Sequence, residues 1–232
     1  MAKKQVKQGG KDMNNALNQK EAFFIKYKKA FIAGIIAIIA IVLIIVSFKS
    51  CKEARNDEAS TAIAKAQELF MNQNYEKALK GDSLSVLGFI KIADEYSNTK
   101  AGNLANLYAA ICYAHLEKWK EAEPYINAYK PKDDVLISPL SVVTMGDIYA
   151  HLNQPDKAVD AYKDAAKMAE KVTEYGNNES VYPMAMKKAA LTLMDQKKNE
   201  EALKIFQDLK EKYGAPFSAQ QEYDKYIEYL SK

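Results

Sequence analysis

The sequence has few of the residues that break helices or cross-link chains. Its 232 residues include nine glycines, six prolines and two cysteines. Two cysteines exclude a small domain held together by many disulfides. So few glycines and prolines argue against a β-sandwich with many tight turns. The rest of the composition, 48% hydrophobic and 27% charged, is that of a folded protein and excludes a wholly disordered chain.

Motifs of enzymatic chemistry are also missing from the sequence. It contains no glycine-rich phosphate loop, no G-x-S-x-G and no H-E-x-x-H. His115 and His151 occur in two identical Tyr-Ala-His-Leu segments, and a metal site would need further ligands close to them. We interpret both as polar residues near turns, and we expect no enzyme activity, no cofactor, no metal site and no small-molecule substrate.

Charge is unevenly distributed along the chain. Residues 1–48 hold eight lysines and two acidic residues, whereas residues 49–232 hold 25 basic and 28 acidic residues. The basic excess lies beside an apolar run, so it indicates a membrane rather than a nucleic-acid partner.

The apolar run, Phe31 to Phe48, reads FIAGIIAIIAIVLIIVSF, without charge or proline. As a helix its 18 residues would extend ~27 Å, close to the ~30 Å hydrocarbon core of a bilayer. Its 13 Ile, Leu, Val and Phe residues would favour insertion by about 4–8 kcal/mol. The run has no polar face, as a soluble core helix would need, and it is longer than the apolar part of a cleaved signal peptide. Lys49 fits poorly with lipoprotein processing at Cys51. We therefore predict a transmembrane helix over residues 30–48.

Topology follows from the lysines. Because basic residues accumulate on the cytoplasmic side, residues 1–29 are predicted to form a basic cytoplasmic tail. Residues 49–232 would then lie in the periplasm, as in a single-pass protein of the bacterial inner membrane. No glycine or proline occurs from Lys49 to Lys80, so residues 49–58 are predicted to continue the helix as a stalk.

The remainder of the sequence repeats. Four short segments align on one alanine each, and these alanines are spaced 44, 36 and 44 residues apart: Ala78, Ala122, Ala158 and Ala202. Apolar residues at helical spacing lie on both sides of each alanine. Such periods predict helix-pair repeats, in which each pair buries its apolar face against the next.

These residues resemble the tetratricopeptide repeat (TPR) family, which has a small residue eight positions into helix A and an alanine at position twenty, opening helix B. The small positions here are Ala66, Ala110, Gly146 and Ala190. The resemblance covers residues 59–214 and implies an all-α fold, an α-solenoid of about four helix pairs, with units one and three about eight residues longer than the consensus. Residues 215–232 are predicted to form a capping helix, opened by the capping-box pattern Ser218 to Gln221. Ser138 followed by Pro139 is predicted to open a helix of unit three.

In this family the concave face uses positions two, five, nine, twelve and thirteen of helix A. The resemblance therefore implies a partner-binding groove, apolar and partly lined by methionine. An alternative is that the C-terminal helix or the stalk packs into it. The predicted groove residues are Leu104, Leu107, Ile111 and His115 in unit two, Leu140, Val143, Asp147 and His151 in unit three, and Met184, Lys187, Leu191 and Met194 in unit four.

A basic tail, one span and a TPR domain together resemble the YfgM-like ancillary subunits of the Sec translocon. The segments Gly81–Tyr96 and Ala101–Tyr113 look like the Bacteroidota versions of such proteins. The resemblance implies a non-enzymatic scaffold that contacts Sec translocon subunits, a membrane-anchored periplasmic chaperone and emerging chains. The alternative is a structural scaffold for another envelope machine, in outer-membrane assembly, secretion or division.

Overall fold

The computed structural model describes residues 2–82, 85–132, 134–170, 180–214 and 217–232. It describes side chains from residue 27 onward, without those of Phe31 and Phe217. The chain divides into two compact units, Met1–Ala54 and Arg55–Lys232.

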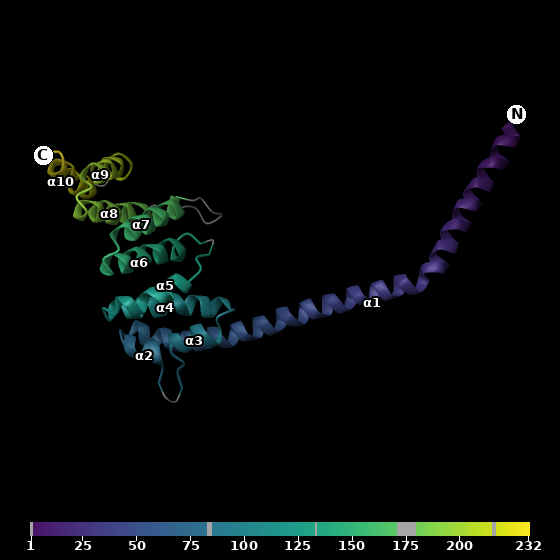
Figure 1. Cartoon of the computed structure of the whole chain (residues 1–232), viewed down its shortest axis with the longest axis horizontal. Coiled ribbons are helices and arrows are strands. Elements are labelled where there is room, and N and C mark those ends of the chain that lie inside the picture. The colour runs from purple at the N-terminus through teal and green to yellow at the C-terminus, as the bar shows by residue number, and fades with distance from the viewer. Residues whose placement is uncertain (1, 83–84, 133, 171–179, 215–216) are drawn as a thin grey trace. The chain divides into compact units, whose positions relative to one another are not determined.

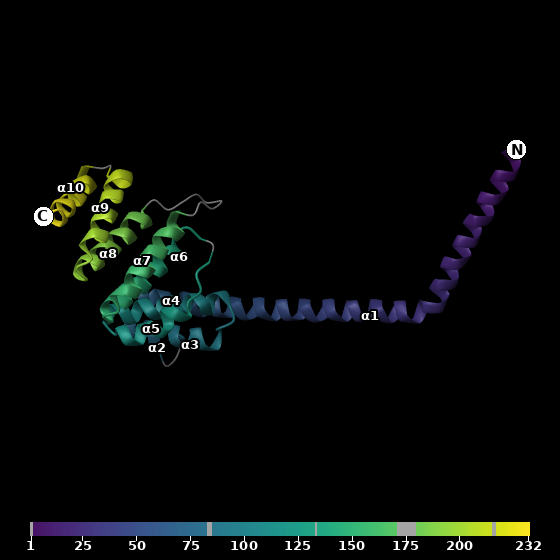
Figure 2. The same ribbon diagram turned by 45° about the horizontal axis from the view of Figure 1, so that its top comes forward.

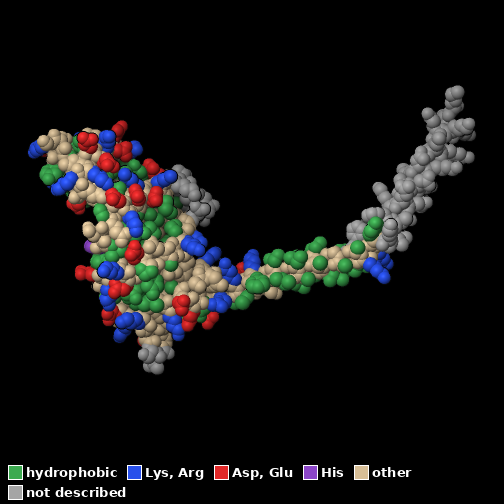
Figure 3. All heavy atoms as spheres, in the orientation of Figure 1, with side chains coloured by type: hydrophobic (Ala, Val, Ile, Leu, Met, Phe, Trp, Pro, Cys, Tyr) green, Lys and Arg blue, Asp and Glu red, His purple; other side chains and the backbone are tan. Residues whose placement is uncertain are grey.

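The first unit consists of helix α1, which runs from Ala2 to Met71 and so continues into the second unit. The part Tyr27–Met71 contains a window with a mean hydropathy of 3.2, none of which is buried. Among the described residues it is the one helix long and apolar enough to cross a membrane. Hydrophobic side chains cover it in Figure 3. Residues 49–58 are helical without a break.

The second unit is a stack of helix pairs, shown in Figures 1 and 2. The end of α1 forms the first helix of the array, and the described residues contain no strand, only an isolated bridge between Gly81 and Leu87. The predicted all-α fold class is therefore confirmed. The helices after α1 are α2 (Tyr75–Lys80), α3 (Phe89–Glu95), α4 (Lys100–His115), α5 (Trp119–Ala128), α6 (Ile137–His151), α7 (Pro155–Glu170), α8 (Val181–Asp195), α9 (Asn199–Tyr213) and α10 (Phe217–Leu230).

The turn inside each helix pair has the same geometry four times. Three residues join the two helices, and the middle one has a positive φ between 57° and 63°. The next backbone N–H donates back to the carbonyl of the helix before the turn, as from Lys118 to Tyr113 at 2.9 Å. Such a left-handed residue closes the end of a helix and reverses the chain. The four left-handed residues share the spacing of the repeat alanines and confirm the four units: Gln73, Glu117, Asn153 and Lys197.

Small residues bring the helices of the array together. All seven alanines at positions eight and twenty are fully buried, and Gly146, at the remaining small position, is buried as well. A small side chain lets two helix backbones approach, and larger side chains fill the space beside them. The spacing of these small residues in the sequence therefore predicts where the helices of the array pack together.

Of these close contacts, the one at Gly146 is the most sensitive to a larger side chain. A Cβ added there would lie 2.4 Å from Cε1 of Tyr162, whose ring is buried. Gly146→Ala should therefore lower the free energy of unfolding by about 1–3 kcal/mol, because the ring must move in a filled core. Denaturant unfolding followed by circular dichroism measures this. Gly34→Ala is the matched control, since nothing lies within 4 Å of a Cβ there, and an equal loss in both variants would contradict the packing argument.

The extra residues of unit one interrupt its second helix. α2 ends at Lys80, the chain leaves and returns through the bridge between Gly81 and Leu87, and α3 continues from Phe89. Gly81 has a φ of 81°, and a Cβ on Gly88 would lie 2.1 Å from the carbonyl oxygen of Leu79, so both positions require glycine. The extra residues of unit three fall within 171–179, outside the described residues.

Helix α6 begins differently from the prediction. It starts at Ile137, so Ser138 is its second residue and not its N-cap. The cap comes from Asp134, whose Oδ1 accepts the N–H groups of Leu136 at 3.1 Å and Ser138 at 3.0 Å. The Ser138 hydroxyl donates to Oδ2 of Asp134 at 2.6 Å and accepts the N–H of Lys132. Ser218 likewise lies inside α10, which begins at Phe217.

Asp134→Ala should lower the free energy of unfolding by about 1 kcal/mol at neutral pH, as expected for a lost cap. Burial by itself would raise the pKa of Asp134, but the hydrogen bonds from Ser138, Leu136 and Ile137 lower it below its ordinary value. A carboxyl whose pKa is lower in the folded state stabilises the fold above its unfolded pKa and stops doing so as the pH falls through the folded pKa. The difference between variant and wild type should therefore shrink on acidification below about pH 4. A constant difference across that range would contradict the capping role.

Helix α10 covers the end of the array, as predicted. Tyr223 is buried, and Tyr226, Ile227 and Leu230 pack against the core formed by α6 to α9. The ring of Tyr226 stacks on that of Phe206 at 4.5 Å. A single helix that buries the last apolar face is the expected cap of a solenoid.

Candidate protein-binding surface

A pocket lies where the first helices of units two, three and four meet. Its volume is about 370 Å³, and it takes side chains from α4, α6 and α8, with one from α5. Four of its lining residues are apolar and five carry polar or ionisable groups, so it offers both apolar contact and hydrogen bonding to a ligand. The lining residues are Ile111, Ala114, His115, Trp119, Thr144, Asp147, Ile148, His151 and Lys188.

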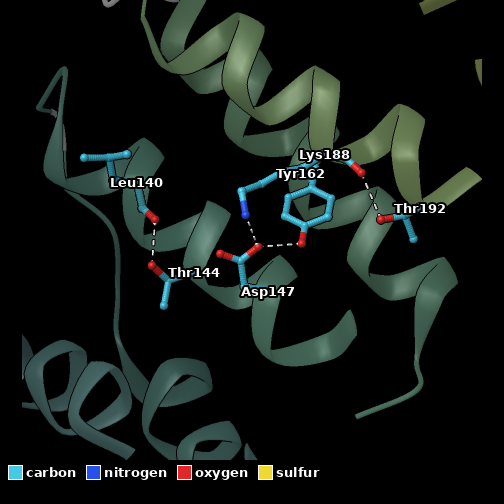
Figure 4. Close-up of polar contacts among 6 residues, drawn as sticks. All are labelled: Leu140, Thr144, Asp147, Tyr162, Lys188 and Thr192. Carbon is cyan, nitrogen blue, oxygen red and sulfur yellow. Dashed lines mark hydrogen bonds and ion pairs between the residues drawn. The ribbon is translucent and has the colours of Figure 1, made fainter. Parts of the chain in front are cut away.

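Asp147 is the centre of a polar cluster in this pocket (Figure 4). Its Oδ1 accepts the hydroxyl of Tyr162 at 2.6 Å and pairs with Nζ of Lys188 at 2.8 Å. The ammonium of Lys188 also lies 5.9 Å from the centroid of the Tyr162 ring. The cluster therefore ties α6, α7 and α8 together at the pocket wall.

Tyr162 acts in this cluster as a fixed donor. Burial first, and then the hydrogen bond to Asp147 and its charge, raise the pKa of Tyr162 well above its ordinary value. The hydroxyl therefore stays protonated near neutral pH and donates to one oxygen of Asp147.

The two histidines stack on aromatic rings of the preceding unit. His151 lies parallel to Trp119 with ring centroids 3.7 Å apart, and His115 lies parallel to Tyr75 at 4.4 Å. Each histidine ends helix A of its unit, and each aromatic opens helix B of the unit before. The prediction that they are only polar turn residues was therefore incomplete, because they join neighbouring repeats.

The structure places the predicted groove residues in three groups. Ile111, His115, Asp147 and His151 line the pocket together. A second group is partly buried and packs against the core clusters: Leu104, Leu140, Met184, Leu191 and Met194. Lys187, the remaining polar member, is half-buried and pairs with Glu222 of α10.

Leu107 and Val143 form the third group and correct the prediction. They are 5% and 4% exposed and belong to the core, so a partner cannot reach them. Both occupy position five of helix A. Because neighbouring helix positions are about 100° apart, the rotation that buries position five turns position six toward the pocket.

Position six supplies two pocket residues that the sequence reasoning missed. They are Thr144 of α6 and Lys188 of α8, and Lys188 makes this pocket more polar than the apolar groove predicted. Trp119 was also missed, although it opens the Trp-Lys-Glu-Ala segment that marks unit two. The sequence signal for this residue was an aromatic at the start of helix B, which Tyr75 matches in unit one.

The C-terminal helix adjoins the groove in unit four. Lys187 pairs with Glu222 of α10 at 3.0 Å. A second pocket of about 530 Å³ lies between Met194 and the α10 residues Glu222, Lys225, Tyr226 and Tyr229. Helix α10 therefore adjoins the groove at this end and leaves a pocket beside it, whereas the pocket around Asp147 has no lining residue from α10.

Two further observations concern metal and thiol chemistry. The described residues contain no group of three His, Cys, Asp or Glu side chains placed to hold a metal ion. Cys112 is fully buried, and burial raises its pKa to about 12, so its thiol stays protonated near neutral pH. The pocket itself is lined by the stacked rings of Trp119 and His151 and by the ion pair of Asp147 and Lys188.

Comparison with known proteins identifies the fold of the helix array. No protein-family model matches the sequence, and no curated protein does either. Among solved structures, the chain is similar to YrrB, a TPR protein with an unusual peptide-binding site, with a TM-score of 0.50 and 18% identity. The match covers 78% of this chain and 84% of YrrB. The array is therefore TPR-like. At this identity the likeness shows the fold alone.

Proposed function

We propose that the protein is a non-enzymatic, membrane-anchored scaffold that binds a segment of a partner protein in the Asp147 pocket. The observation that carries the proposal is this pocket on the first helices of a TPR-like array. It combines apolar walls with a fixed carboxylate, and so offers both contact area and orientation. The peptide-binding site of YrrB supports the same use of the fold.

The anchor in this proposal is the apolar segment of α1. Residues 30–48 would span the bacterial inner membrane and residues 1–29 would lie in the cytoplasm. Residues 49–58 would form the stalk, 59–214 the periplasmic repeats and 215–232 the cap. The hydropathy of α1 and the eight lysines before the span support this topology.

The partners we propose are Sec translocon subunits and a membrane-anchored periplasmic chaperone. A scaffold held close to the membrane could contact chains as they emerge. The support is the likeness of the tail, span and repeats to YfgM-like subunits. A scaffold for another envelope machine would use the same surface and differs in the partner captured.

Site-specific photocrosslinking in intact cells tests the proposal. A photoreactive residue at Thr144, which lines the pocket, should capture a translocon subunit or the chaperone, identified by mass spectrometry. Lys163, exposed on the outer helix α7, is the control position and should capture neither. Capture of an outer-membrane assembly or division protein would replace the translocon assignment. The absence of any protein adduct specific to Thr144 would overturn the scaffold itself.

A further inference from the structure

The carboxylate of Asp147 has one oxygen left over for a ligand. Both of its contacts, the hydroxyl of Tyr162 at 2.6 Å and Nζ of Lys188 at 2.8 Å, fall on Oδ1. None of the described residues donates a hydrogen bond to Oδ2, and Figure 4 draws both dashed lines to the other oxygen. The side chain is 36% exposed, so a group that enters the pocket can reach this acceptor.

Lys188 has unused donors at the same point. Its ammonium carries three N–H groups, of which the ion pair with Asp147 uses one. Within the described part of the chain, the other contact of the ammonium is with the face of the Tyr162 ring, 5.9 Å from the centroid. Because Lys188 and Oδ2 both adjoin Oδ1 of Asp147, a polar atom placed there would meet an acceptor and a donor together.

The two charges also cancel within the pocket. With histidine neutral, Asp147 and Lys188 are the charged residues of its lining. A charged ligand of either sign would be attracted by one of them and repelled by the other. A purely apolar ligand would desolvate both groups without giving them a new partner, which costs free energy. The pair therefore favours an uncharged group in which one atom both donates and accepts, and a hydroxyl is such a group.

The rest of the pocket favours a hydroxyl carried on a ring. Ile111, Ile148 and Trp119 offer apolar surface, and Trp119 is stacked on His151. The volume of about 370 Å³ lies near the lower end of the range for ligand pockets, ~300–1,000 Å³, and so suits one large side chain. Serine and threonine bring little apolar area, and the indole N–H of tryptophan donates but cannot accept. Tyrosine combines an aromatic ring with a hydroxyl.

We propose that the Asp147 pocket recognises a tyrosine side chain presented by the partner segment. The phenol hydroxyl donates to Oδ2 of Asp147 and accepts from Lys188, while the ring contacts Trp119 and the two isoleucines. This inference rests on the proposed scaffold function. It adds a requirement on the partner, which must offer an accessible tyrosine.

The only tryptophan of the chain makes occupancy of the pocket measurable. Trp119 lines the pocket, so a fluorinated tryptophan incorporated there gives one fluorine NMR signal from the site. The full chain in detergent is titrated with three pentapeptides, each acetylated and amidated. They differ only in the central residue, which is tyrosine, phenylalanine or arginine between glycines and serines. The change in the signal with peptide concentration gives the Kd of each.

The tyrosine peptide should bind at least about tenfold more tightly than either of the others, the factor expected for a hydrogen bond to a charged group. Lys188→Met should lower the preference for tyrosine over arginine at least about tenfold, because it removes a donor and leaves the pocket negatively charged. Lys163→Met is the matched control, since Lys163 is exposed on α7, and it should keep the wild-type preference. Circular dichroism of each variant verifies that it is folded.

Equal binding of the tyrosine and phenylalanine peptides would show that the pocket selects only for apolar area, and tighter binding of the arginine peptide would show that it selects for charge. Either result overturns the inference, as does a tyrosine preference that Lys188→Met leaves unchanged, and the scaffold proposal stands in all three cases. If no peptide changes the signal but Thr144 captures a partner, the inference is overturned and the proposed function stands. If no peptide changes the signal and Thr144 captures nothing, both fail.

Discussion

Replacing Phe206 with alanine should lower the free energy of unfolding by about 3–5 kcal/mol, the usual effect of removing a fully buried aromatic ring. Phe206 of α9 is fully buried in the C-terminal core, and its ring contacts those of Tyr223 and Tyr226 of α10. The variant would lose the ring itself and the surface on which the capping helix packs. Denaturant unfolding of the full chain in detergent, followed by circular dichroism, measures the loss.

The loss should be concentrated at one end of the array. In a stack of repeats each unit contacts only its neighbours. The buried residues form separate clusters, and the one that contains Phe206 extends over α6 to α10. Hydrogen exchange should therefore accelerate in α8 to α10 and change little in α4. Gln207→Ala, an exposed position on the same helix, is the control. Equal acceleration in α4 and α9 would show that the array unfolds as one unit.

The repeat fold could be predicted because its determinants are local and recur. Each unit needs a small residue where two helices cross, and an alanine such as Ala122 where the second helix begins. Those positions can be read from spacing alone, and the structure buries all of them. The left-handed turn residues were not predicted. They are Gln, Glu, Asn and Lys, and the expected glycine occurs in none of the four turns.

Helix starts were predicted less well, because several residues nearby can supply the same cap. Ser138 followed by Pro139 resembled a start, but Asp134 accepts the N–H groups and Ser138 bonds to Asp134. The break between α2 and α3 had a signal in its two glycines, Gly81 and Gly88. It was overlooked because good helix formers lie on either side.

The pocket shows what spacing alone cannot provide. Counting positions along helix A located Asp147 and both histidines, but it placed Leu107 and Val143 in the groove and omitted Lys188. Which of two adjacent positions faces the pocket depends on the rotation of the helix in the stack. That rotation is set by contacts with neighbouring units, such as the stack of His151 on Trp119. These contacts are distant in the sequence.

The largest expected effect concerns the anchor. Replacing both Ile38 and Ile41 with lysine should prevent stable insertion of α1. Each lysine near the centre of a span costs about 2.5–3.5 kcal/mol and each lost isoleucine about 0.3–0.6 kcal/mol, so the pair costs roughly 6–8 kcal/mol, as much as the whole apolar run provides. The chain should then move from the carbonate-resistant membrane fraction to the soluble fraction.

The I38L/I41L variant keeps the hydropathy and should remain in the membrane. Mass spectrometry of the membrane-bound wild type should find residues 1–48 still attached, which separates an anchor from a cleaved signal peptide. A double-lysine variant that stays resistant to carbonate would show that something other than this segment holds the protein to the membrane.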